Sequence, residues 1–151
     1  MALARKASGR RKAKVSPNDP AELVRVCARL AEDKKAEGIV ILDLRELMYV
    51  TDYFLIASGT NPRQLQAVRG AIQEEMTKRG ERPIGVEGAQ QDRWVLMDYG
   101  DFVVHVFDPE WRKLYDLELL WGDAPRVEWQ AVPRRRAAPR SRAKKEKQDG
   151  G

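Results

Sequence analysis

This 151-residue chain has one cysteine, one histidine and no long apolar run. A single cysteine, Cys27, excludes an intramolecular disulfide, so the sequence is typical of a reducing compartment. A single histidine, His105, excludes a metal site built from several histidines. No apolar run approaches the roughly 18 to 20 residues that a membrane span needs, and the first residues lack the apolar core of a secretory signal. We therefore expect a soluble, intracellular protein.

Charge is distributed unevenly along the chain. Residues 1–18 carry six Lys or Arg and no acid, and residues 131–151 carry eight Lys or Arg against two acids. The span 19–130 holds 14 basic and 21 acidic residues, a net charge of −7. We predict one domain over 19–130 between a disordered basic arm and a disordered basic tail, because such segments hold few apolar side chains. These arms are either solubilising tails or, as we favour, contacts to nucleic acid phosphate.

The stretch from Trp94 to Phe107 predicts a β-hairpin at the centre of the domain. Two apolar, β-branched-rich runs flank Asp98-Tyr99-Gly100-Asp101, and Gly beside Asp is typical of a tight turn. Both runs are apolar at nearly every position, so we expect both faces of both strands to be covered. Alternate side chains of the second run share a face. The expected core face holds Phe102, Val104 and Val106, and the face that a helix or a partner covers holds Val103, His105 and Phe107.

Three patterns predict helices, each beginning with a capping residue followed by proline. They begin at Asp19-Pro20, Asn61-Pro62 and Asp108-Pro109, and Glu22 and Gln64 would complete capping boxes in the first two. Further strands are predicted over 38–43, 53–57 and 83–87, the last at a sheet edge because of its Pro and Gly. The resulting order, α-β-β-α-β-β-β-α, predicts a single α+β domain with a mixed five-stranded sheet and flanking helices.

The residue spacing shows no recognisable catalytic constellation. Asp43, Asp98 and Asp101 are candidate metal ligands, yet the last two bracket a turn where Asp is expected for backbone geometry alone. Ser58-Gly59-Thr60 precedes a helix, as a phosphate cradle does, but no Walker pattern or following Lys supports that reading. Cys27 lies in an apolar helical stripe and is interpreted as a core residue. We therefore predict no catalytic residue, no metal and no cofactor.

Three stretches occur in a familiar order. They are Asp52-Tyr-Phe-Leu-Ile-Ala-Ser-Gly-Thr-Asn61, the run from Trp94 through Leu-Met-Asp-Tyr-Gly-Asp-Phe-Val-Val-His-Val-Phe107, and Arg112-Lys-Leu-Tyr-Asp-Leu-Glu-Leu-Leu-Trp121. Together they resemble the ribosomal silencing factor family (RsfS, Iojap or YbeB-like proteins). The resemblance covers roughly residues 20–125 and leaves out both basic arms.

The resemblance implies a nucleotidyltransferase-like fold without known transferase activity. It also implies that the protein binds the large ribosomal subunit through ribosomal protein L fourteen, blocks association with the small subunit and represses translation when nutrients are limiting. The residues at the corresponding positions agree with a loss of transferase activity. Nucleotidyltransferases use a Gly-Ser turn and then alternating metal-binding carboxylates, whereas Ser58-Gly59 has the reverse order and residues 83–87 supply one acid, Glu87.

We expect an acidic domain of this kind to bind a cationic ribosomal protein, with the basic arms touching nearby ribosomal RNA. Trp and Tyr are the residue types most enriched as binding anchors. The predicted partner-binding residues are Trp94, Asp98, Tyr99, Asp101, His105, Phe107, Tyr115 and Trp121. For several of them a core or turn-forming role stays open.

Two other functions also stay open. A residual nucleotidyltransferase would use Asp43, Glu87 or Asp98, and a general RNA-binding protein would act through its arms. The oligomeric state is open as well, with a homodimer of the free protein as one alternative. A bacterial cytoplasmic location is favoured over an organelle: the Arg-rich start resembles a transit peptide, but it is short and shares its composition with the C-terminal tail.

Overall fold

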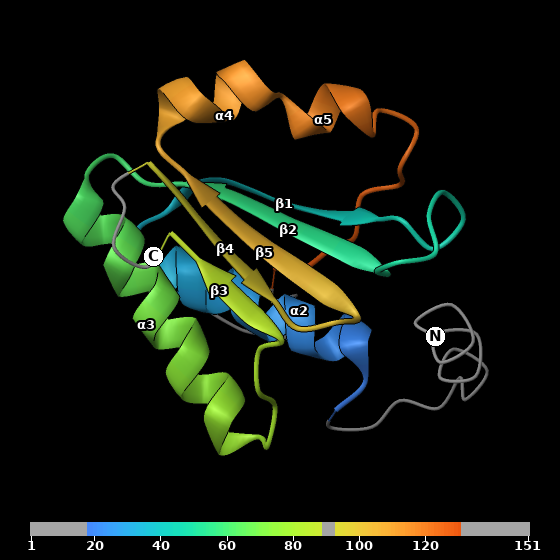
Figure 1. Cartoon of the computed structure of the whole chain (residues 1–151), viewed down its shortest axis with the longest axis horizontal. Helices are drawn as coiled ribbons and strands as arrows, with labels where there is room; N and C mark the ends of the chain where they lie inside the picture. Colours follow the sequence, from blue (N-terminus) through green and yellow to red (C-terminus); the bar gives the residue numbers. More distant parts are fainter. Residues whose placement is uncertain (1–17, 89–92, 131–151) are drawn as a thin grey trace, which may run out of the picture.

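The computed structural model describes residues 18–88 and 93–130. Five strands form one sheet with helices on both of its faces (Figure 1). The elements, in chain order, are α2 (Pro20–Asp33), β1 (Glu37–Asp43), β2 (Tyr53–Ser58), α3 (Pro62–Lys78), β3 (Gly85–Glu87), β4 (Trp94–Asp98), β5 (Phe102–Phe107), α4 (Pro109–Tyr115) and α5 (Leu117–Leu120). None of these helices is long and apolar enough to span a membrane. The predicted basic arms lie outside the described residues, apart from Asn18.

The sheet confirms the predicted α+β class and the mixed strand pairing. Its strand order is β1-β2-β5-β4-β3, with β2 parallel to β5 and the other neighbours antiparallel. The strand predicted over 83–87 is shorter, at Gly85–Glu87, and lies at an edge as expected. The last predicted helix is two helices, because Asp116 adopts a left-handed conformation with φ 45° between them. The nucleotidyltransferase-like part of the expectation stays a prediction.

Two of the three predicted helix caps are confirmed. Asn61 Oδ1 accepts from the Gln64 backbone N–H at 2.8 Å, and Asp108 Oδ1 accepts from the Trp111 N–H at 2.8 Å. The capping box predicted at Asp19 is wrong, since the Asp19 side chain makes no capping hydrogen bond. Helix α2 still begins at Pro20, because proline at the first helical position has no N–H to satisfy and a preset φ.

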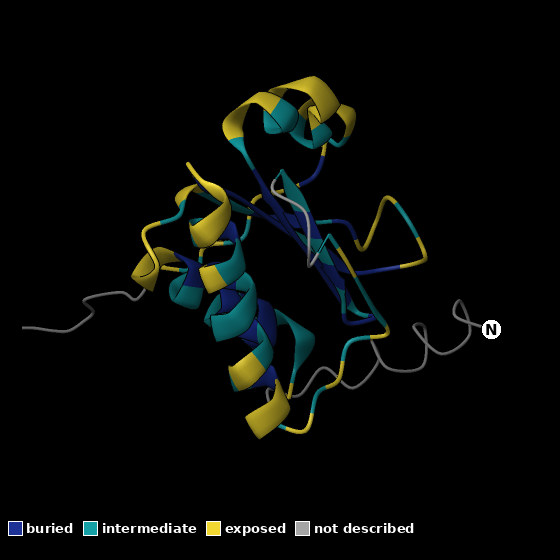
Figure 2. Cartoon of the chain, turned by 60° about the vertical axis from the view of Figure 1, so that its left-hand side comes forward, coloured by how far each residue is buried: buried dark blue, intermediate teal, exposed yellow. Residues whose placement is uncertain are grey.

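Helices α2 and α3 cover one face of the sheet and form the main core with it (Figure 2). The predicted core face of β5 is confirmed, since Phe102, Val104 and Val106 are all buried in this cluster. Cys27 is buried there too, and burial raises the pKa of its thiol. It is therefore a neutral core residue, as the sequence predicts, and not a nucleophile.

Helices α4 and α5 cover only part of the opposite face. They pack over β1, β2 and β5 through a second cluster that contains Leu42, Ile56 and Phe107. All six residues of β5 are buried, so the expectation of two covered faces is confirmed for that strand. It is wrong for β4, where Trp94, Leu96 and Asp98 are only half-buried. The difference arises because β4 lies beyond β5 and next to the edge strand, where α4 reaches only Trp94 at the start of the strand.

The turn between β4 and β5 has the predicted chemistry. Gly100 has a φ of 87°, and its N–H donates to Asp98 Oδ1 at 2.8 Å. A side chain with a Cβ is disfavoured at this φ by about 1 to 2 kcal/mol. Asp98 and Gly100 therefore act together to fix the register of the central hairpin.

We expect Gly100→Ala to lower the free energy of unfolding by about 1 to 2 kcal/mol. A matched control is Gly70→Ala inside α3, where an added Cβ meets nothing within 4 Å. That change should instead raise stability by about 0.5 to 1 kcal/mol, because alanine loses less backbone entropy in a helix. Urea denaturation measures both values. Equal effects of the same sign would contradict this account of the turn.

Candidate protein-docking surface

Six ring side chains gather where α4 meets β4 and β5, and we call them the aromatic cluster. They are Phe54, Trp94, His105, Phe107, Trp111 and Tyr115. Trp94 is opposite Phe107 in the antiparallel pair, which brings their rings to 5.0 Å between centroids. Tyr115 of α4 packs on the same indole at 4.8 Å. The hairpin register thus places Trp94 at the centre of the cluster.

His105 is buried inside this cluster and is neutral. The Trp94 Nε1–H donates to His105 Nδ1 at 3.3 Å, which assigns the imidazole proton to Nε2. Burial lowers the pKa of His105 from 6.5 to about 3. Nε2 has no hydrogen-bond partner among the described residues. The single histidine is therefore a structural group that orients Trp94, and it is neutral in the folded protein.

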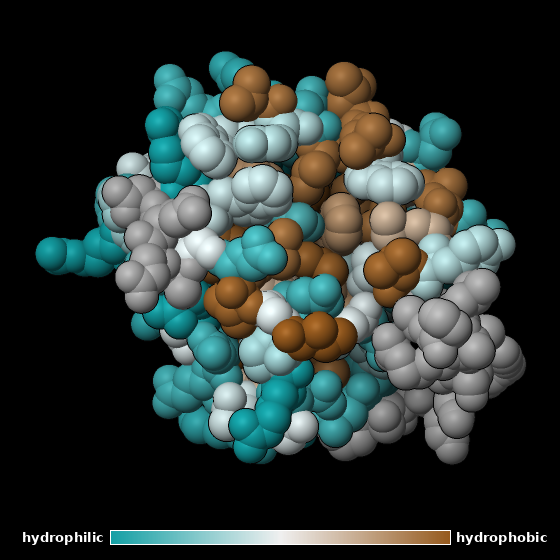
Figure 3. All heavy atoms as spheres, in the orientation of Figure 1, coloured by the Kyte–Doolittle hydropathy of each residue, from teal (hydrophilic) through white to brown (hydrophobic). Residues whose placement is uncertain are grey.

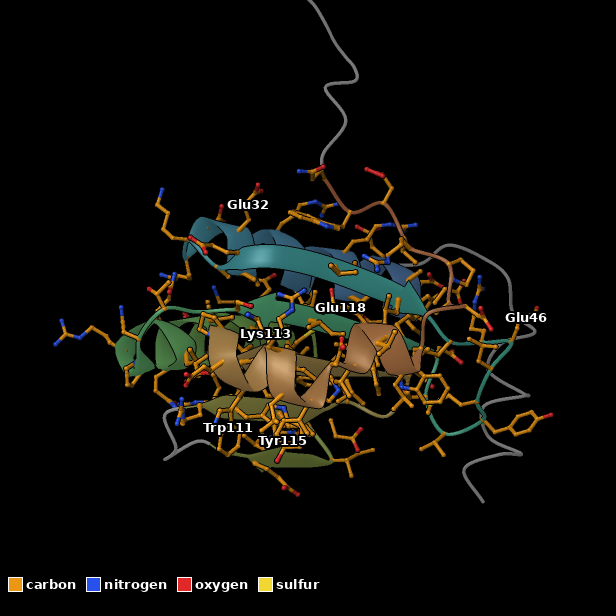
Figure 4. The ribbon with its side chains drawn as sticks, turned by 90° about the horizontal axis from the view of Figure 1, so that it is seen from above. Glu32, Glu46, Trp111, Lys113, Tyr115 and Glu118 are labelled. Atoms are coloured by element: carbon orange, nitrogen blue, oxygen red, sulfur yellow. The ribbon has the colours of Figure 1, made fainter. Side chains whose placement is uncertain are left out.

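Trp94 and Tyr115 are accessible at the outer side of the cluster, and we call this pair the aromatic rim. Tyr115 is 44% exposed, and Trp94 and Trp111 are half-buried. Figure 4 shows Trp111 and Tyr115 on the side of α4 toward β4, whereas Lys113 and Glu118 lie on the side toward β1. A shallow pocket of about 90 Å³ adjoins Trp94 and is lined by Glu87, Gly88, Trp94 and Leu96. Such a surface suits a side chain of another protein better than a small-molecule substrate, whose pockets usually exceed about 300 Å³.

Arg112 fixes α4 and α5 to the sheet. Its Nε and Nη2 donate to the two carboxylate oxygens of Glu118 at 3.0 and 2.8 Å, and its Nη1 donates to Ser58 Oγ at 2.8 Å. The guanidinium lowers the pKa of Glu118. The Arg112 side chain is only 14% exposed. The Arg112–Glu118 pair joins α4 to α5 across Asp116. It therefore holds the two helices together and keeps Tyr115 of α4 in position.

Three of the predicted binding residues lie away from the aromatic cluster. Asp98, Tyr99 and Asp101 are at the hairpin turn, at the other end of β4, which spans roughly 13 Å. Tyr99 is buried on the opposite face, 5.1 Å from the Phe102 ring, and burial raises its pKa to about 12. The Asp101 carbonyl accepts from the Asp52 N–H at 2.9 Å. The structure therefore divides the predicted set, and the binding role of these three residues stays a prediction.

The remaining predicted residues fall into two places. Trp94, His105, Phe107 and Tyr115 belong to the aromatic cluster, with His105 and Phe107 buried beneath the other two. Trp121 is half-buried at the end of α5, against the second core cluster. Only Trp94, Tyr115 and Trp121 of this group can touch a partner without rearrangement.

The described residues form no metal centre. They hold no group of three or more His, Cys, Asp or Glu able to bind a metal. Asp43 is on β1 and Glu87 on β3, at opposite edges of the sheet. Arg45 donates to both carboxylate oxygens of Asp43 at 2.9 and 2.7 Å. Asp43 is thus far from the other two carboxylates named for a residual nucleotidyltransferase, whereas Glu87 and Asp98 lie on the paired strands β3 and β4.

Sequence reasoning missed several residues that shape this surface. Phe54 and Trp111 complete the cluster, and Arg112 holds α4 in place. The signal for Trp111 was available, since it directly follows the Asp108-Pro109 helix start. The Arg112–Glu118 pair was not visible, because a separation of six residues is not a helical contact spacing unless the helix is broken between them.

The accessible rings of Trp94 and Tyr115 therefore form a candidate docking surface. The family model described as "Ribosomal silencing factor during starvation" (RsfS) matches residues 17–150. This chain belongs to the RsfS family.

Individual relatives agree with that assignment. The chain is 41% identical over 111 residues to the ribosomal silencing factor RsfS of Halalkalibacterium halodurans, covering 74% of this chain and 95% of that one. It is 34% identical over 95 residues to the mouse protein named mitochondrial assembly of ribosomal large subunit protein 1, covering 61% and 42%. A crystal structure of a Chromobacterium violaceum protein matches with a TM-score of 0.67 and 32% identity, covering 75% of this chain and 93% of that one.

The buried histidine makes stability depend on pH. In the unfolded chain His105 gains a proton as the pH falls below 6.5, but in the folded protein it does so only near pH 3. Stability is therefore lost as the pH falls through this window, by about 2 kcal/mol between pH 6.5 and about 4.5. His105→Gln should remove that part of the loss. Urea unfolding of both proteins at a series of pH values measures it, and parallel curves would contradict it.

Loss of the Arg112 clamp should destabilise the fold. Arg112→Ala leaves the Glu118 carboxylate and the Ser58 hydroxyl without their donor, which we expect to cost about 2 kcal/mol. Arg93→Ala is the matched control, because Arg93 is also paired with carboxylates, those of Asp108 and Glu110, but its side chain is 43% exposed. The control should cost clearly less. Thermal or urea unfolding compares the two, and an equal loss would contradict the clamp.

Proposed function

We propose that this chain binds the large ribosomal subunit through ribosomal protein L fourteen and sterically blocks association with the small subunit. It thereby represses translation under nutrient limitation, in the bacterial cytoplasm. The observation that carries the proposal is the accessible aromatic rim formed by Trp94 and Tyr115 beside the uncovered part of the sheet. Membership in a family described as silencing factors, and a relative named for large-subunit assembly, support the choice of partner.

In this proposal the ring residues predicted to bind the partner have different roles. Trp94 and Tyr115 contact the partner directly, and Trp121 extends the contact along α5. The buried rings of His105 and Phe107 act from below, since both stack against Trp94 at 6.0 and 5.0 Å. Binding anchors of this kind work because their support is rigid and little side-chain entropy is lost on docking.

Charge supports the same partner. Residues 19–130 hold 14 basic and 21 acidic residues, so the domain is acidic, and ribosomal proteins are generally cationic. Complementary charge raises the association rate and orients the encounter more than it adds affinity. Asp98 and Asp101, at the turn, are proposed to act in this way. Tyr99 then serves to hold that turn against the core.

We propose a non-catalytic mechanism, because steric exclusion needs occupancy of the joining face and no chemical step. The separation of Asp43 from Glu87 and Asp98, at the opposite edge of the sheet, supports this choice over a residual nucleotidyltransferase. Titration with nucleoside triphosphates and magnesium discriminates the two. Binding at millimolar nucleotide or below would favour the enzyme.

Truncation of the rim should weaken binding to purified large subunits. For Trp94→Ala and Tyr115→Ala separately we expect a loss of about 2 kcal/mol, a roughly 30-fold higher Kd. Glu32→Ala, exposed on α2 at the opposite face, is the control and should change Kd by less than about twofold. Co-sedimentation gives the Kd values. Equal binding of the unaltered protein to free large subunits and to joined ribosomes would rule out the steric mechanism.

The basic arms are proposed to assist by touching ribosomal RNA. Removing residues 1–17 and 131–151 should weaken binding and flatten its salt dependence, because fewer counterions are released from phosphate. Binding should nevertheless persist through the rim. Complete loss of binding at low salt would instead favour a general RNA-binding protein that acts through its arms.

A further inference from the structure

A second apolar surface lies at the far end of the α4–α5 unit, away from the aromatic cluster. Figure 3 shows apolar residues over α5 and over the neighbouring loop between β1 and β2. A groove of about 270 Å³ lies there, and it is lined by Leu47, Leu119, Leu120, Trp121, Gly122 and Asp123. We call it the α5 groove. None of its lining residues belongs to the aromatic cluster, although Trp121 also belongs to the contact proposed above.

Several large apolar side chains are exposed at the α5 groove and beside it. Leu119 is 75% exposed, Leu120 68% and Leu47 40%. Beside them in the loop, Tyr49 and Val50 are 67% and 66% exposed. Single exposed apolar residues need no explanation, but a contiguous set around a groove marks an interaction site. The groove between Leu119 and Leu120 of α5 and Leu47 of the loop can take the side chain of a partner.

Charge at the groove indicates the kind of partner. Asp123 is the charged residue that lines the groove, and Glu46 stands exposed beside Leu47. The nearby cation Arg45 is already held by both carboxylate oxygens of Asp43. An acidic rim around an apolar floor suits a protein segment that presents a large apolar side chain between Lys or Arg residues. It does not suit RNA, whose phosphates the carboxylates repel.

The chain's own arms are poor occupants. Beyond alanine and proline, their apolar side chains are only Met1, Leu3, Val15 and Val132. The described chain ends on the other face of the sheet, where the Trp129 carbonyl accepts from Arg29 of α2 at 3.2 Å.

We propose that the α5 groove is a second docking site, which takes an apolar side chain flanked by basic residues from a protein of the large ribosomal subunit. This inference rests on the proposed function and adds a second point of attachment to it. Two separated contacts on one rigid unit fix the orientation of the bound domain, which a single contact does not. Steric exclusion of another particle depends on that orientation.

The test uses purified large ribosomal subunits and the full-length protein. The double substitution Leu119→Ser with Leu120→Ser should raise Kd by about tenfold or more, by the same factor at low and high salt, because the lost contact is apolar. Asp123→Lys should raise Kd chiefly at low salt, because it opposes a basic flank. Ile84→Ser, a 71% exposed apolar residue next to β3, is the matched control and should change Kd by less than about twofold.

Several results would overturn the inference. A double variant within about twofold of the unaltered protein removes the second site while the proposed function stands. If the double variant and the Ile84→Ser control raise Kd by the same factor, the second site is likewise removed while the proposed function stands. Failure of the unaltered protein to bind large subunits removes both proposals. If the unaltered protein is a dimer by analytical ultracentrifugation and the double variant a monomer, the groove is an interface between copies of this chain.

Discussion

Burial of β5 on both faces is the constraint on which the rest of this structure depends. The strand lies at the centre of the sheet, parallel to β2 and antiparallel to β4, and every one of its residues is buried. Such a strand needs a covering layer on each side. Helices α2 and α3 supply one layer, and the short α4–α5 unit supplies the other. Because α4 and α5 reach only over β1, β2 and β5, the neighbouring strand β4 keeps one face partly open.

The docking surface is a consequence of that incomplete cover. Trp94 begins β4 at the border of the covered area, so its ring packs on Phe107 beneath and Tyr115 above while its edge remains accessible. His105 is buried there in its neutral form, with Nδ1 accepting from Trp94 and Nε2 without a hydrogen-bond partner among the described residues. Arg112 holds α4 to Ser58, the last residue of β2. The same residues that complete the fold therefore shape the surface proposed to meet the ribosome.

Much of the fold was predictable because its signals are local. Apolar runs around an Asp-Gly turn define the hairpin, alternation along β5 separates the two faces, and Asn61 and Asp108 cap helices as their residue types suggest. The parts that failed depend on distant contacts. The sequence around Asp116 does not predict its left-handed φ, because only a few per cent of non-glycine residues adopt it, even though Asp is among the enriched types. The Arg112–Glu118 pair depends on that conformation and is therefore not predictable either. Residue type likewise cannot show that Tyr99 turns to the α2 side while Trp94 turns to the α4 side. That choice depends on pairing register.

The central claim is that the accessible aromatic rim sits against a protein of the large ribosomal subunit at the joining face. Photo-crosslinking from a reactive amino acid at position 115 tests it most directly, with position 32 on α2 as the comparison. On free large subunits we expect a crosslink from position 115 to ribosomal protein L fourteen and none from position 32, and no crosslink when the subunits are already joined. A crosslink to RNA alone, or the same product on joined ribosomes, would contradict the account.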